Sequence, residues 1–171
     1  MKKNFALQTL LLLALSFLSC EKGKPKPNIE ISTVGCGDFI VYQIIPDDKI
    51  LSVWIDRDKI AFSKDFQTFD NIATEDFATV EIEQNCDIEA VWYGICNDVF
   101  QQPNCQSTFW TLQKGILSFK VSEVPTGPSC TNFYLATVIL ENAEFKKDNS
   151  TETLTFDRVE FNNIGVGWCA G

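Results

Sequence analysis

Short segments rich in β-branched and aromatic residues, separated by turn residues, recur along the chain after its first 35 residues. Phe39–Ile45 precedes the turn Pro46-Asp47-Asp48, and Ala78, Val80 and Ile82 alternate with polar residues. No window of about 11 residues in this part shows helical periodicity. About eight or nine such strands, with turns every 8–12 residues or so, predict an all-β fold. The favoured architecture is an antiparallel β-sandwich, and the alternative is a β-barrel.

Several finer expectations follow from the same pattern. Further strands are predicted at Leu51–Ile55, Lys59–Phe62, Glu89–Tyr93, Phe133–Leu140 and Thr153–Phe161. Phe133–Leu140 is apolar on both faces, which places it centrally. The residues Thr108 to Ser122 predict a hairpin that turns at Lys114-Gly115. The apolar alternation slips between Phe156 and Val159, which predicts a bulge near Asp157.

The chain begins with a short basic head, Met1-Lys2-Lys3-Asn4, followed by an apolar stretch from Phe5 to Leu18. This order is typical of a secretory signal peptide. A membrane-spanning helix needs about 20 apolar residues, and polar Glu21-Lys22 follows too soon for that. Residues 1–19 are therefore predicted to be a cleaved signal peptide.

The end of this stretch, Leu15-Ser16-Phe17-Leu18-Ser19-Cys20, resembles the lipobox of bacterial lipoproteins, in the relaxed form found in Bacteroidetes-type bacteria. The resemblance implies that Cys20 becomes the acylated N-terminus and anchors the chain to a membrane, by analogy the outer membrane. Residues 20–35, with Pro25 and Pro27, are predicted to form a tether. Residues 36–171 are then a single β-sandwich domain.

Charge restricts the partners of this domain. The sequence holds 14 basic and 23 acidic residues; from Asn28 onward nine basic and 22 acidic residues remain, a net charge of −13. Such a surface repels phosphate backbones, so nucleic-acid binding is not expected.

Six cysteines remain once Cys20 is set aside, and an even number in an exported chain predicts up to three disulfides. They are Cys36, Cys86, Cys96, Cys105, Cys130 and Cys169. Cys96 and Cys105 bracket a short loop, which favours that bridge. Cys36 and Cys169 could join the ends of the domain, and Cys86 with Cys130 would follow by elimination. The spacing required for a zinc site is missing, so no metal or other cofactor is expected.

Catalytic options are few because the chain contains no histidine. This excludes Ser-His-Asp and Cys-His arrangements, and no phosphate-binding loop is present. Carboxylates remain, and Glu81 and Glu83 share a strand face, where a solvated surface is the expectation. Asp47, Asp48, Asp56 and Asp58 lie in adjacent turns, but their spacing is not that of an EF-hand.

Three tryptophans, Trp54, Trp92 and Trp110, are candidate ligand-binding residues. Trp54 lies opposite in parity to the apolar residues of its strand, so it is expected to face solvent. Exposed aromatic rings stack on sugars or anchor protein partners. The sequence therefore favours a non-enzymatic binding module of the cell envelope, whose ligand is a glycan or an envelope protein. The alternative is a carboxylate-dependent hydrolase.

Three segments of the body also look like parts of small secreted β-rich lipoproteins of Bacteroidetes-type bacteria. They are Gly94–Val99, Phe109-Trp110 with Lys114–Phe119, and Tyr134–Val138. This resemblance supports the β-rich class and implies no activity.

Overall fold

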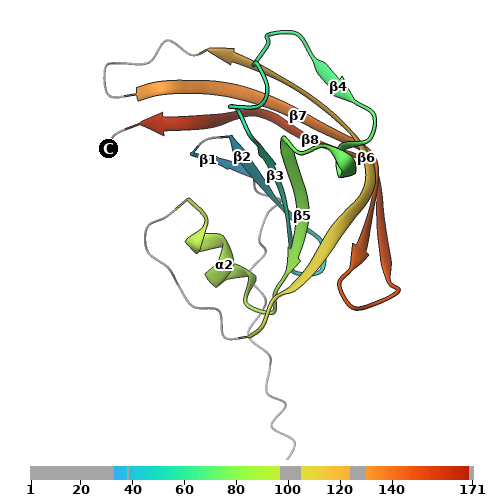
Figure 1. The fold of residues 1–171 in the computed structure, drawn as a ribbon. Helices are drawn as coiled ribbons and strands as arrows, with labels where there is room; N and C mark the ends of the chain where they lie inside the picture. Colours follow the sequence, from blue (N-terminus) through green and yellow to red (C-terminus); the bar gives the residue numbers. More distant parts are fainter. Residues whose placement is uncertain (1–32, 38, 97–104, 124–129, 170–171) are drawn as a thin grey trace, which may run out of the picture. The chain divides into compact units, whose positions relative to one another are not determined.

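The computed structural model describes residues 33–37, 39–96, 105–123 and 130–169. Within these ranges, eight antiparallel strands form one nearly closed sheet (Figure 1). The prediction of an all-β antiparallel fold is confirmed. Because the strands form one hydrogen-bonded sheet, the arrangement corresponds to the barrel alternative more closely than to two packed sheets.

The sheet follows the chain almost in sequence. Its strands are β1 (Thr33–Cys36), β2 (Ile40–Ile45), β3 (Lys49–Ile55), β4 (Gln67–Phe69), β5 (Ala78–Gln84), β6 (Thr108–Glu123), β7 (Cys130–Lys147) and β8 (Thr153–Cys169). The order is β1-β2-β3-β5-β6-β7-β8, and β4 pairs with the second half of β6. The helical elements described are the 3₁₀ turn η1 (Ile72–Thr74) and the helix α2 (Ile88–Gly94). As predicted, the Phe133–Leu140 segment lies in a strand, β7, that has neighbours on both sides.

The first and last strands approach each other where the sheet nearly closes. Gly167 N donates a hydrogen bond to Gly37 O at 2.7 Å. A Cβ atom on Gly35 would lie only 2.2 Å from the carbonyl oxygen of Gly165. Glycine at position 35 therefore permits the close backbone approach of β1 and β8.

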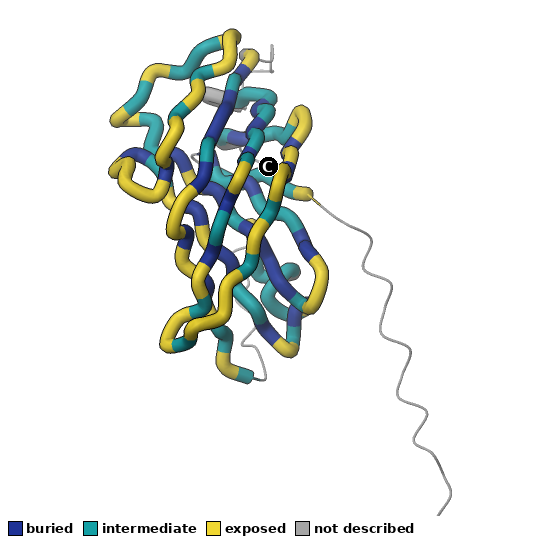
Figure 2. The backbone as a smooth tube through the Cα atoms, turned by 90° about the vertical axis from the view of Figure 1, so that its right-hand side faces the viewer, coloured by how far each residue is buried: buried dark blue, intermediate teal, exposed yellow. Residues whose placement is uncertain are grey.

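The core fills the inside of the curled sheet, as the buried stretches of strand in Figure 2 indicate. Leu51, Val53 and Ile55 alternate with more exposed residues along β3, and all three are completely buried. Their cross-strand partners Ile82 and Val80 belong to the same core. We call the face that carries these residues the inner face, and the opposite one the outer face.

The predicted hairpin at Lys114-Gly115 is wrong, because this segment is the middle of the continuous 16-residue strand β6. A Cβ atom on Gly115 would contact Ala143 Cα and Leu140 Cδ1, each at 3.4 Å. The pairing with β7 shifts register on both sides of Lys114. The glycine therefore marks an irregular, closely packed part of a strand instead of a turn.

The predicted strand Glu89–Tyr93 is also wrong, because these residues form helix α2. The Asp87 side chain accepts a hydrogen bond from Ala90 N at 3.4 Å and so caps the helix N-terminus. The helix has only seven residues, which is too short to show a helical period in an 11-residue window.

Lys59–Phe62 does not form the predicted strand; Lys59 lies in a turn and the following residues form no ladder. Lys59 Nζ donates instead to Asp76 O at 2.8 Å. The Phe62 ring packs against Phe39 and Tyr134, with centroid distances of 5.0 and 5.6 Å. The apolar residues of this segment thus cover the core without pairing.

The predicted bulge near Asp157 is wrong, because the β7–β8 register does not shift there, although the alternation of buried and exposed residues does. Asp157 and Arg158 are both exposed, and on β7 the exposed Asn142, with φ of 50°, separates buried Leu140 from buried Ala143. Both strands change parity at the same place, so their pairing continues unchanged. The two register shifts of this ladder lie elsewhere. One falls between the pairs Thr131–Trp168 and Tyr134–Val166, and the other between Ala136–Ile164 and Val138–Phe161.

The disulfides are Cys36–Cys96 and Cys86–Cys105, with Cα–Cα distances of 5.3 and 6.4 Å. The expected bridges Cys96–Cys105, Cys36–Cys169 and Cys86–Cys130 are therefore wrong, since loop length alone does not reveal which segments meet across a sheet. The remaining two cysteines, Cys130 and Cys169, are Cα partners in the β7–β8 ladder. Such cross-strand pairs have Cα separations of about 4.5–5.5 Å, within the range that a disulfide spans.

Candidate functional site

Trp54 points outward from β3, as its parity predicts. Its side chain is 38% exposed, whereas its sequence neighbours Val53 and Ile55 are completely buried. Its register partners are Ile40 on β2 and Thr79 on β5. A large aromatic side chain is therefore presented on the outer face of the sheet.

A cavity of about 390 Å³ opens beside this ring. It is lined by Trp54, Ile55, Asp56, Arg57 and Asp58. The turn that forms its polar side is fixed by local hydrogen bonds: Asp58 N donates to Asp56 Oδ1 at 3.0 Å, and Lys59 N donates to Asp56 O at 3.2 Å. The cavity thus combines an aromatic surface with both acidic and basic side chains.

Trp92 lies on the seven-residue helix α2. The helix C-terminal end is held by the Cys36–Cys96 bridge, and Cys36 is the register partner of Ile40. At its other end, Asn85 N donates to Asp48 O at 3.0 Å. Trp92 is partly buried. The helix that carries Trp92 is therefore attached to the outer face of β1 through this disulfide.

Trp110 lies on the inner face and is only 5% exposed. It is the register partner of buried Ile82 and of Lys147. The three tryptophans do not form one surface, and Trp110 is not accessible from the side that presents Trp54.

Two other large apolar side chains are exposed among the described residues. Phe109, on β6, is 43% exposed and is the outer-face partner of Glu83. Phe66 is 46% exposed, and Lys120 Nζ lies 4.7 Å from its ring centroid.

Glu81 and Glu83 lie on the outer face, as expected from their alternation. Glu83 accepts a hydrogen bond from Ser107 Oγ. Burial raises the pKa of Glu81 above its usual value, and the carboxylates of Glu83 and Asp148 raise it further. Neither Glu81 nor Glu83 lines the cavity beside Trp54.

The turn acids are engaged in local contacts. Asp47 pairs with Lys49 at 3.2 Å, and Asp56 holds its own turn. Within the described ranges, no group of three or more histidine, cysteine, aspartate or glutamate side chains is placed to hold a metal ion.

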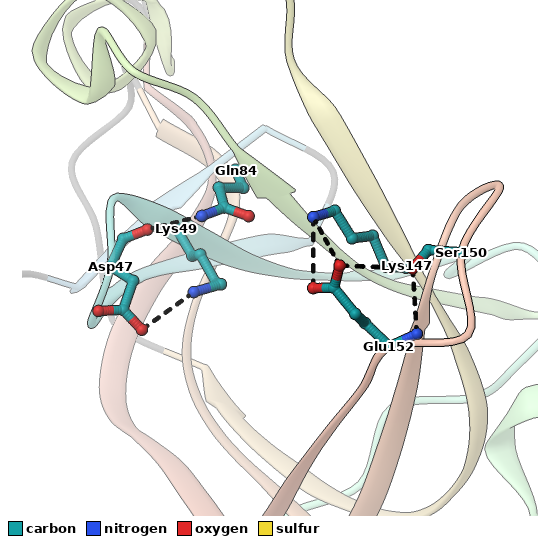
Figure 3. Close-up of polar contacts among 6 residues, drawn as sticks. All are labelled: Asp47, Lys49, Gln84, Lys147, Ser150 and Glu152. Carbon is teal, nitrogen blue, oxygen red and sulfur yellow. Dashed lines mark hydrogen bonds and ion pairs between the residues drawn. The ribbon is translucent and has the colours of Figure 1, made fainter.

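A polar cluster that sequence reasoning missed lies on the inner face, at the end of the sheet where β2 turns into β3 and β7 turns into β8. Figure 3 shows Lys49 and Lys147 with their carboxylate partners, Asp47 and Glu152. The ammonium groups of both lysines lie near the Trp110 ring, at 5.9 and 5.6 Å from its centroid. The parity of Lys49 with Leu51 and Val53 was the available indication that this lysine faces inward.

The predicted lipid anchor Cys20, the signal peptide and residues 20–32 of the predicted tether lie outside the described residues. Residues 33–35 of that predicted tether instead belong to strand β1. In the part of the chain that is described, no helix has the length and apolar character required to cross a membrane. Comparison with protein-family models, with curated proteins and with solved structures found no match to this chain.

Proposed function

We propose that this chain is an exported lipoprotein, anchored through acylated Cys20, whose β domain is a non-enzymatic binding module of the cell envelope. We further propose that its ligand is a glycan, bound on the outer face at Trp54. The single observation that carries the ligand proposal is the exposed Trp54 ring beside a cavity of about 390 Å³.

The surroundings of Trp54 suit a sugar. An indole ring offers a flat apolar surface against which the C–H face of a sugar ring can stack. Asp56 and Asp58 can accept hydrogen bonds from sugar hydroxyls, and Arg57 can donate them. A few convergent polar groups beside an apolar surface are typical of ligand sites. The strand and its fixed turn hold these groups in place before a ligand binds, which reduces the entropic cost of binding.

The predicted anchor and the charge support display away from a membrane surface. Two acyl chains would hold Cys20 stably on a bilayer. The net charge of −13 from Asn28 onward repels anionic headgroups, so the domain is expected to stay clear of the bilayer at the end of its tether.

A glycan array tests the ligand proposal, with the full mature chain kept in detergent. We expect saturable binding of a subset of glycans, and we expect Trp54→Ala to weaken it by about 30-fold or more. Loss of a central aromatic contact costs about 2 kcal/mol or more, which corresponds to that factor.

Phe109→Ala is the matched control, because it removes another exposed aromatic ring from the same outer face. Its binding should equal that of the wild type. The glycan proposal would be contradicted if the wild type bound no glycan, or if Trp54→Ala bound as well as Phe109→Ala. A negative array would direct the search to protein partners in the envelope.

A further inference from the structure

Lys49 on β3 and Lys147 on β7 face the inside of the sheet, and β5 and β6 lie between these two strands. Lys49 begins β3 and shares the parity of buried Leu51, and its side chain is only 7% exposed. Lys147 is the last residue of β7 and stands directly opposite Trp110 on β6. Two ammonium groups and one buried indole therefore converge at one end of the core.

The ion pairs of these lysines are made with solvent-facing carboxylates. Asp47, which pairs with Lys49 at 3.2 Å, has a side chain 82% exposed. Glu152, which pairs with Lys147 at 3.3 Å, has a side chain 60% exposed. Water screens the charge of such exposed carboxylates, which weakens these ion pairs. A carboxylate from another molecule could therefore take the place of either partner and keep the lysine paired.

Among the described residues, the buried indole nitrogen Trp110 Nε1 has no hydrogen-bond partner. Gln43 Oε1 is also without a partner there, but Leu51 and Ile82 separate Gln43 from Trp110 in the row of register partners, so Gln43 does not belong to this cluster. A buried polar group without a partner is unfavourable. The indole N–H can only donate, so its missing partner is an acceptor.

We propose that Lys49, Trp110 and Lys147, here called the lysine–tryptophan site, bind the carboxylate group of a small organic acid. The carboxylate oxygens would accept hydrogen bonds from the two ammonium groups and from the indole N–H. Lactate, a small organic acid with one carboxylate group, serves as the probe. The site would be entered from the side of Lys147, whose side chain is 27% exposed.

The test is a titration of the isotope-labelled full chain in detergent, observed through the indole N–H resonances of its four tryptophans. The Trp110 resonance is identified by its absence in Trp110→Phe. We expect sodium lactate to shift this resonance saturably and to leave that of Trp54 unchanged. Sodium chloride at equal ionic strength should have no such effect.

Variants distinguish a binding site from a purely structural cluster. Lys147→Met should weaken lactate binding at least about tenfold, and Lys114→Met, which removes a lysine 65% exposed on β6, should have no effect. Glu152→Gln should strengthen binding several-fold, because it removes the carboxylate that competes for Lys147.

Three results would overturn this proposal. They are the absence of a saturable shift of the Trp110 resonance, an equal response to inorganic phosphate or chloride, and unchanged or weaker binding by Glu152→Gln. None of them bears on the glycan proposal, because Trp54 lies on the opposite face of the sheet.

Discussion

Replacing Phe119 with alanine is expected to lower the free energy of unfolding by about 3–5 kcal/mol, the usual cost of removing a buried aromatic ring. Phe119 is completely buried. Its ring lies at centroid distances of 5.9, 6.0 and 6.4 Å from Phe39, Phe69 and Phe62. These rings come from four separate segments of the chain, so the cavity would weaken contacts between all of them. Denaturant unfolding followed by tryptophan fluorescence measures the loss.

Phe109→Ala is the control for this prediction, because Phe109 lies on the same strand and is 43% exposed. Its cost should stay below about 1 kcal/mol. Equal losses for the two variants would mean that Phe119 is not at the centre of the core.

Removing the Cys36–Cys96 bridge, by replacing both cysteines with serine, is expected to cost about 4 kcal/mol. The bridge closes a loop of 60 residues, and the chain-entropy relation gives this value for that length. For the Cys86–Cys105 bridge, with a separation of 19, the same relation gives about 3 kcal/mol. The two double variants therefore form a matched pair, compared by equilibrium unfolding under non-reducing conditions.

The order of the two losses is the informative result. A larger loss for the Cys86–Cys105 variant would contradict the assignment of the longer loop to Cys36–Cys96. Peptide mapping of the unreduced wild type checks the pairing independently, because Cys36 and Cys96 should appear in one linked peptide.

Alternation predicted most of the sheet, because a strand with one buried face has period two. This alternation correctly predicted which side chains of β3 and β5 are buried, and that Trp54 points outward. It could not separate a short helix from a strand at Ile88–Gly94, although Asp87 was a recognisable capping residue. Lys114-Gly115 predicts a turn but lies within β6, because glycine serves both turns and close strand packing.

The candidate site was predicted only in part, because it depends on which strands are neighbours. Trp54 and Trp110 both lie in strands, yet Trp54 is exposed on the outer face and Trp110 is buried on the inner face. Lys147 lies beside Trp110 because of the register between β6 and β7. These strands have 16 and 18 residues and their ladder contains irregularities, so their sequences alone do not reveal the register. The disulfide pairing was mispredicted for the same reason.

The anchored state is the basis of the proposed function, and mass spectrometry of the chain extracted from membranes tests it most directly. We predict that the N-terminal peptide begins at Cys20 and carries two or three acyl chains, and that Cys20→Ala is absent from the membrane fraction as a mature form. A mature chain with an unmodified Cys20, or one that washes from membranes with salt, would contradict the account.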